Sequence, residues 1–357
     1  MSMHLLKKIL ISVLLITLVL FSSVFIFSKL SPWPNALLIR YEFTKDAEKV
    51  NNELKKYVPE GITSLLNIHY DETDEDAFLD IYYPSKMENS SVKCPVIVWT
   101  HGGGWISGNK EQVSNYCKIL AGKGYIVVSI DYSIAPEKKY PLPVKQLMNA
   151  LTFLKNNAER FHINSEKFIL AGDSGGAHIS AQTANIITSP AYSELINIKP
   201  SLSQLQLAGL LLYCGPFDIS NVNIEGDFGN FLETVIWSYS GRKDYMNDTF
   251  FQTASVIKYI TKDFPPAFIS AGNGDPLEPQ SIYLARKLDS LGVNTDTLFF
   301  SKDYSPPLPH EYQFNLDTDA GKLALESSVK FLQTISPPEF PEPEKRKDLT
   351  ESINSGK

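Results

Sequence analysis

The chain has 357 residues, of which 43% are apolar, and a formal net charge of −7. This length fits one large α/β domain with additions, or two small domains, and the composition excludes a wholly disordered chain. The acidic balance, without a long Lys/Arg run, argues against a nucleic-acid-binding protein. Three scattered cysteines are too few for a disulfide scaffold or a four-thiolate zinc site.

The N-terminus carries a long apolar stretch. Residues 9–27 contain no charge and follow Lys7 and Lys8, and a helix of this length spans a bilayer core. The stretch exceeds the signal-peptide core of about 7–15 residues, and small residues do not line up for cleavage. We therefore expect residues 1–30 to be an uncleaved membrane anchor, with a cleaved signal sequence as the alternative. Because only Lys29 follows the stretch closely, the positive-inside rule favours a cytoplasmic N-terminus and an extracytoplasmic body.

The rest of the chain alternates short apolar runs with helical patterns. Residues 35–57 read as an amphipathic helix, and later helices are expected at 144–159 and at 280–291, where Gly292 ends the pattern. The predicted strands, most of them buried, are 79–83, 96–99, 126–130, 168–170, 210–213, 267–269 and 298–300. The alternation predicts an α/β fold with a mostly parallel, doubly wound sheet flanked by helices.

Two segments interrupt this pattern. Residues 219–262 form an insertion rich in aromatic residues, which indicates a satellite core, a lid over a pocket, or both. Residues 337–357 are rich in Pro, Glu and Lys, a composition typical of a disordered tail.

The sequence GDSGG at 172–176 follows a predicted strand and precedes a run of small, helix-compatible residues. A tight turn between strand and helix exposes the central residue, Ser174, beside the positive end of the helix dipole. The flanking glycines leave room for that turn. An N-capping serine in a glycine-rich loop is the alternative, but the context favours Ser174 as a nucleophile.

A serine nucleophile needs a base, and the base needs an acid to orient it. Where a nucleophilic serine lies on such a strand-to-helix turn, the triad follows in the chain order serine, acid, histidine, with the histidine after the last strand. Of the six histidines, only His310 lies beyond every predicted strand. Asp275 follows the strand at 267–269, so it lies where catalytic groups of open α/β sheets gather. We therefore predict Asp275 as the acid. The rival carboxylates are Asp218, Glu278 and Asp303.

The sequence HGGGW at 101–105 follows the strand at 96–99. Consecutive glycines let backbone N–H groups approach a developing oxyanion. Gly102, Gly103 and Gly175 are therefore the predicted oxyanion-hole donors. The alternative without a function is a flexible glycine turn. A phosphate-binding P-loop is disfavoured because the Lys-Ser/Thr ending of that motif is missing.

Together these motifs resemble the hormone-sensitive-lipase-like branch of the α/β-hydrolases. The HGGGW and GDSGG motifs, the segment DYSIAPE at 131–137, Asp275 with Pro276 and Leu277, and His310 occur in that branch's order over roughly residues 75–335. Two positions depart from the pattern: Ser133 replaces an arginine, and Glu311 follows the histidine where glycine is common. A carboxylate beside the base can raise its pKa.

The resemblance implies an α/β-hydrolase domain over residues 66–336, with a helical cap built from residues 31–65 and about 219–262. It implies ester hydrolysis through an acyl-enzyme on Ser174, without metal or cofactor, and the aromatic residues of the insertion suggest short to medium acyl chains. Within the motifs, Trp105 and Asp173 are further candidates for substrate binding. A deacetylase or peptidase with the same triad remains open, as does a membrane-tethered binding module without turnover. The sequence leaves the oligomeric state open.

Overall fold

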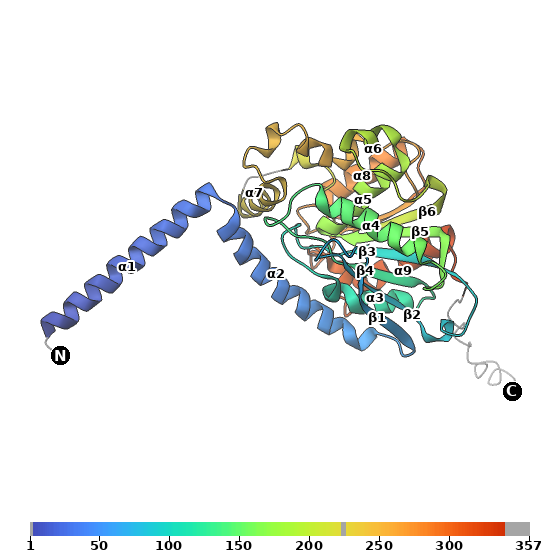
Figure 1. Cartoon of the computed structure of the whole chain (residues 1–357), viewed down its shortest axis with the longest axis horizontal. Helices are drawn as coiled ribbons and strands as arrows, with labels where there is room; N and C mark the ends of the chain where they lie inside the picture. Colours follow the sequence, from blue (N-terminus) through green and yellow to red (C-terminus); the bar gives the residue numbers. More distant parts are fainter. Residues whose placement is uncertain (1–2, 223–225, 340–357) are drawn as a thin grey trace.

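The computed structural model describes residues 3–222 and 226–339. An eight-stranded sheet in the order β1-β2-β4-β3-β5-β6-β7-β8 forms its centre (Figure 1). The strands are β1 (Ile62–His69), β2 (Phe78–Pro84), β3 (Cys94–Thr100), β4 (Ile126–Ile130), β5 (Ile163–Asp173), β6 (Leu207–Tyr213), β7 (Ala267–Ala271) and β8 (Thr295–Phe299). β1 and β2 pair antiparallel, β2 pairs antiparallel with β4, and every other pair is parallel. The predicted mostly parallel α/β sheet is confirmed.

Helices cover both faces of the sheet. The helices of the described residues are α1 (Met3–Leu30), which projects away from the sheet, α2 (Trp33–Leu54), α3 (Ser114–Ala121), α4 (Leu142–Asn156), α5 (Ser174–Thr188), α6 (Pro190–Ile196), α7 (Gly226–Ser240), α8 (Glu278–Ser290) and α9 (Asp319–Ile335). Alternate residues of β3 enter different cores: Val96 and Val98 join the core of α4, α5 and α8, whereas Ile97 and Trp99 join that of α3 and α9. Side chains of a strand point alternately to its two faces, so strands buried on both faces read as continuous apolar runs.

The edge strand β1 was not predicted from the sequence. Its residues alternate irregularly between half-buried and exposed, and the register with β2 shifts between Leu65 and Ile68. Asn67, inside that irregularity, has a positive φ of 55°. A strand with one partner and a bulge buries too little to show the continuous apolar pattern on which the other strands were recognised.

The two N-terminal helices differ in how they contact the body. α1 projects away from it as a single helix, and α2 returns along its side (Figure 1). No residue of α1 is buried, and its length and mean hydropathy are sufficient to span a membrane. α2 is held by Arg40, whose guanidinium donates to the carbonyl of Ile106 at 2.6 Å and pairs with Glu137 at 2.7 Å.

The insertion at 219–262 contains α7 and several short 3₁₀ turns. Its aromatic side chains are largely packed: Tyr239 is fully buried and stacks on Trp105, with ring centroids 4.8 Å apart. Phe231 of α7 meets Phe43 of α2 at 5.5 Å. The insertion and α2 are therefore in direct contact. Of the tail predicted to be disordered, residues 340–357 lie outside the described part of the chain.

Candidate active site

Ser174 begins α5 directly after β5. Its φ is +49°, a left-handed conformation that side-chain-bearing residues rarely adopt. The turn depends on the glycines around it. A Cβ on Gly176 would lie closer than 3.0 Å to the backbone oxygens of Thr100 and His101, and one on Gly172 would meet the backbone of Gly176. This close approach explains why small residues surround the serine.

The predicted acid and base lie together. Asp275 follows β7, and its Oδ2 is 2.8 Å from Nδ1 of His310 in the loop after β8. The other carboxylate oxygen, Oδ1, accepts a hydrogen bond from the Leu277 N–H at 2.8 Å. The Asp275 side chain is fully buried, so both of its oxygens have fixed partners. The rival Asp218 instead accepts hydrogen bonds from Ser220, two residues away.

Cys214 completes this cluster and was not singled out from the sequence. Potential ligand atoms of Cys214, Asp275 and His310 lie within 4.8 Å of one another. Burial raises the pKa of the Cys214 thiol to about 11, so the thiol is protonated at neutral pH. The residue directly follows β6 and has a φ of 45°. Cys214 lies at the carboxyl end of a central strand, beside the strand that precedes Asp275. This position is the signal by which the sequence could have identified Cys214 as part of the site.

Two opposing effects shift the pKa of His310. Burial by itself lowers the pKa of the imidazole, but the hydrogen-bonded Asp275 carboxylate raises it, with a net result above the usual value. A carboxylate at hydrogen-bond distance stabilises the imidazolium. The arrangement therefore favours proton acceptance by His310.

The HGGGW loop follows β3 and faces the serine turn. His101 is buried, stacks on Tyr132 with ring centroids 4.3 Å apart, and keeps its Nδ1 2.8 Å from the Gly102 carbonyl oxygen. Burial lowers the pKa of His101 to about 4, so this histidine is neutral. Gly103 has a φ of 103°. A Cβ on Gly175 would contact the Trp105 backbone nitrogen at 3.2 Å, so the two motifs approach closely.

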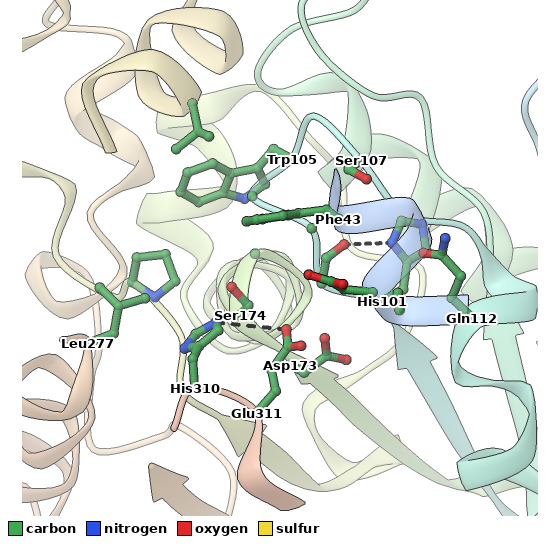
Figure 2. Close-up of a pocket in the computed structure, with 18 of the residues that line it drawn as sticks. Phe43, His101, Trp105, Ser107, Gln112, Asp173, Ser174, Leu277, His310 and Glu311 are labelled. Atoms are coloured by element: carbon green, nitrogen blue, oxygen red, sulfur yellow. Dashed lines mark hydrogen bonds and ion pairs between the residues drawn. The ribbon is translucent and has the colours of Figure 1, made fainter. Parts of the chain in front are cut away.

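These groups line one pocket of about 450 Å³. Ser174, Asp173, His310 and Glu311 lie on one side, and Trp105 and Phe43 on another (Figure 2). Asp275 contacts His310 but is not among the lining residues. The apolar lining also draws on both segments expected to form the cap: Phe43, Ala47 and Val50 from α2, and Phe228, Phe231, Leu232 and Val235 from α7.

The carboxyl groups of Asp173 and Glu311 lie next to each other in this pocket. Asp173 is buried and accepts a hydrogen bond from Nε1 of Trp99 at 2.8 Å. Glu311 has a φ of 58°, and its Oε1 lies 3.8 Å from Nε2 of His310. Burial, and then the Glu311 carboxylate, raise the pKa of Asp173 well above the usual value. In the sequence, Glu311 differs from the family pattern, in which glycine commonly follows the histidine. Its position in the pocket lining became visible only in the fold.

Solved structures identify the class of fold. Esterase B from Lactobacillus rhamnosis aligns with a TM-score of 0.71 and 22% identity, covering 84% of this chain and 94% of that one. The carboxylesterase EstE1, from a metagenomic library, aligns with a TM-score of 0.66 and 19% identity, covering 84% and 98%. The chain has the α/β-hydrolase fold.

The family follows from the sequence match. The BD-FAE family matches residues 79–288, more than half of the chain, and the chain belongs to that family. An arylesterase of Saccharolobus solfataricus is 27% identical over 266 residues, 72% of this chain and 81% of that protein. Carboxylesterase NlhH of Mycobacterium tuberculosis is 27% identical over 222 residues, 60% of this chain and 66% of that protein.

Esterase LipQ of Mycobacterium tuberculosis is 26% identical over 220 residues, and there the match spans only 50% of the relative. Fold, family and relatives together put the chain among the serine hydrolases that cleave carboxylic esters.

Proposed function

We propose that this ester hydrolase works through an acyl-enzyme on Ser174. His310, oriented by Asp275, accepts the proton of the serine hydroxyl as the oxygen attacks the ester carbonyl. It then donates that proton to the leaving alcohol. Water, activated by His310, releases the acid in the second half of the cycle. The observation that carries the proposal is the 2.8 Å contact between His310 and Asp275 in a site whose pocket also contains Ser174 in a left-handed turn.

The oxyanion of each tetrahedral intermediate is assigned to the backbone N–H groups of Gly102, Gly103 and Gly175. All three residues line the pocket beside Ser174. Donors fixed before the reaction stabilise the developing charge without reorganisation, and loss of one costs about 2.7–4 kcal/mol.

The pocket wall supports short to medium acyl chains. Its volume of about 450 Å³ is bounded largely by aromatic and aliphatic side chains from α2 and α7, which suit an apolar acyl group. Trp105 is assigned to substrate binding. Its indole is 1% exposed, and Nε1 has no hydrogen-bond partner among the described residues. Trp105 lines the pocket, and a buried donor without a partner is rare in folded proteins. Asp173, the other candidate, also lines the pocket.

The test uses the full chain in detergent with p-nitrophenyl acetate, butyrate and octanoate, and compares wild type with Ser174→Ala. We expect kcat to fall by about three orders of magnitude or more in the variant, and the chain-length profile to fall off at octanoate. Ser180→Ala, in the same helix, is the matched control. Equal rates in wild type and Ser174→Ala would instead identify a binding module without turnover.

We further propose that α1 anchors the protein in a membrane, with the catalytic domain outside the cytoplasm. No residue of α1 is buried. Trp33 and Trp237 lie near the junction of α1 with the body, and Nζ of Lys243 lies 5.0 Å from the Trp237 ring centroid and 3.2 Å from the Lys29 carbonyl oxygen. Aromatic and basic side chains at the end of an apolar helix are typical of a membrane interface.

A further inference from the structure

The pocket wall carries three carboxyl groups, and the basic side chains among its described lining residues are the two histidines, His101 and His310. Asp46, Asp173 and Glu311 line it, and none of the lining residues in the described part of the chain is Lys or Arg. Most of the remaining lining is apolar or aromatic. Charges in such surroundings are weakly screened, so their field extends into the cavity. The pocket therefore favours a ligand group of positive charge and disfavours an anionic one.

Glu311 holds the carboxylate nearest to the reacting atoms. Its Oε1 is 3.8 Å from Nε2 of His310, which is too long for a hydrogen bond. The same oxygen lies closer than 3.0 Å to the point where a side chain on Gly102 would begin, as does Oδ2 of Asp173. About one third of the Glu311 side chain is exposed, toward the pocket (Figure 2). The carboxylate is thus positioned between the predicted base and the predicted oxyanion loop.

Asp173 and Glu311 differ in how they are held. Asp173 is fixed by the Trp99 indole at 2.8 Å and is almost fully buried. Two adjacent carboxyl groups in a poorly hydrated site do not both ionise readily. Burial, and then Glu311, raise the pKa of Asp173 well above the usual value. Glu311 is the more exposed of the two side chains and faces the pocket.

Aromatic rings complete the surroundings. Phe43 and Phe231 meet at 5.5 Å, and Phe228 and Phe231 at 5.6 Å, and all three line the pocket. Ring faces attract alkylated ammonium groups, whose apolar surface they also cover.

We propose that Glu311, backed by Asp173, forms an anionic subsite that binds the ammonium group of a cationic ester beside the scissile carbonyl. The inference rests on the proposed function, because it names the substrate class of the same pocket. The closeness of Glu311 to His310 restricts the ammonium to a position a few bonds from the carbonyl carbon. Such a group can belong to the alcohol part, as in a choline ester, or to the acyl part, as in an amino-acid ester.

A different role for Glu311 would be to adjust the basicity of His310 alone. That role changes the hydrolysis of neutral and cationic esters by the same factor, since the base acts on both. A binding role changes the cationic ester selectively. The ratio of kcat/KM between a cationic ester and its neutral isostere therefore separates the two roles.

The experiment measures acid release by the full chain in detergent at pH 7 for two matched pairs. Acetylcholine is compared with 3,3-dimethylbutyl acetate, and alanine ethyl ester with ethyl isobutyrate. We expect wild type to prefer the cationic member of one pair by about tenfold, and Glu311→Gln to lower that ratio by about tenfold. The pair that responds identifies the side of the ester that carries the ammonium. Glu326→Gln, exposed on α9, is the matched control and should leave both ratios unchanged.

Two results would overturn the inference: wild type preferring the neutral member of both pairs, or Glu311→Gln leaving both ratios unchanged. The first needs no variant, so misfolding of Glu311→Gln would not protect the proposal. If neutral esters are cleaved in a Ser174-dependent way while the ratios stay constant, the proposed function stands and the subsite fails.

If no neutral ester is cleaved, the proposed function fails, and binding decides on the subsite. Titration calorimetry of Ser174→Ala with acetylcholine and with alanine ethyl ester, with and without Glu311→Gln, measures that binding directly. Binding weakened about tenfold by Glu311→Gln supports the subsite. Absent binding, or equal binding by both proteins, refutes it.

Discussion

At the scale of single residues, the contact between Asp275 and His310 determines how the site responds to pH. Only the neutral imidazole can accept the serine proton. Burial lowers the pKa of His310, but the hydrogen-bonded Asp275 carboxylate raises it, with a net result above the usual value. Activity is therefore lost as pH falls through that raised pKa and is gained above it.

Asp275→Asn should act on both the rate and the pH profile. Loss of the carboxylate removes the group that orients His310 and stabilises its charged form, so kcat should fall by about 10⁴-fold. The acid limb of kcat/KM should also move to lower pH. A pH series with p-nitrophenyl butyrate measures both, and Asp218→Asn is the control because the described hydrogen bonds of the Asp218 carboxylate go only to Ser220. An unchanged rate and acid limb in Asp275→Asn would remove Asp275 from its proposed role.

At the scale of elements, α2 contributes to the pocket without supplying a proposed catalytic group. Phe43, Asp46 and Val50 line the cavity from this helix. Its attachment centres on Arg40, whose guanidinium donates to the backbone carbonyls of Ile106 and Ala135 and pairs with Glu137. Ile106 directly follows the HGGGW loop, so one side chain connects the helix to the predicted oxyanion loop.

Arg40→Met should therefore loosen α2 and affect binding more than chemistry. Losing the hydrogen bonds to two carbonyls and the half-exposed ion pair should cost about 1–2 kcal/mol of folding free energy. KM for p-nitrophenyl butyrate should rise several-fold while kcat changes less, because α2 forms wall rather than catalytic machinery. Thermal unfolding and steady-state kinetics measure the two effects. Lys45→Met, exposed on the same helix, is the control. A fall in kcat at constant KM would contradict this assignment.

At the scale of the whole molecule, α1 touches the body only near its C-terminal end in the described part of the chain. All of its residues are unburied, and its 28 residues correspond to about 42 Å of helix, more than the roughly 30 Å of a bilayer core. An apolar surface of this size left in water is unfavourable. A membrane around α1 removes that cost. It also places Trp33 and Trp237, which lie where α1 meets the body, at the boundary between membrane and water.

The full chain should therefore remain in the membrane pellet after an alkaline wash and retain its N-terminal methionine or the residue after it. Leu14→Lys puts a charge in the middle of α1 at a cost of about 2.5–3.5 kcal/mol and should shift protein to the soluble fraction, whereas Leu14→Ala should not. Protease added outside intact cells should reach the catalytic domain. A mature chain beginning after α1 would instead identify a cleaved signal sequence.

Much of this protein could be predicted from local sequence. Buried parallel strands are apolar on both faces, so β3 to β7 were recognised as continuous runs. The nucleophile turn has a steric origin, and glycines at 172 and 176 mark a place where a Cβ would collide with backbone. His310 and Asp275 followed from their order relative to the strands, and the structure brings them to 2.8 Å. These features depend on the identity and order of residues along the chain.

Other features depend on which distant segments meet. β1 is an irregular edge strand whose pattern was too weak to recognise. Cys214 reaches His310 only because β6 and β7 are neighbours in the sheet. Glu311 reaches Asp173 and the oxyanion loop only because a left-handed backbone turns its side chain inward. The sequence by itself determined the parallel sheet and the candidate catalytic residues, since both follow from local pattern and order. The charge and shape of the pocket were decided by tertiary structure, because they result from contacts among α2, α7 and the segments that follow β3, β5, β6, β7 and β8.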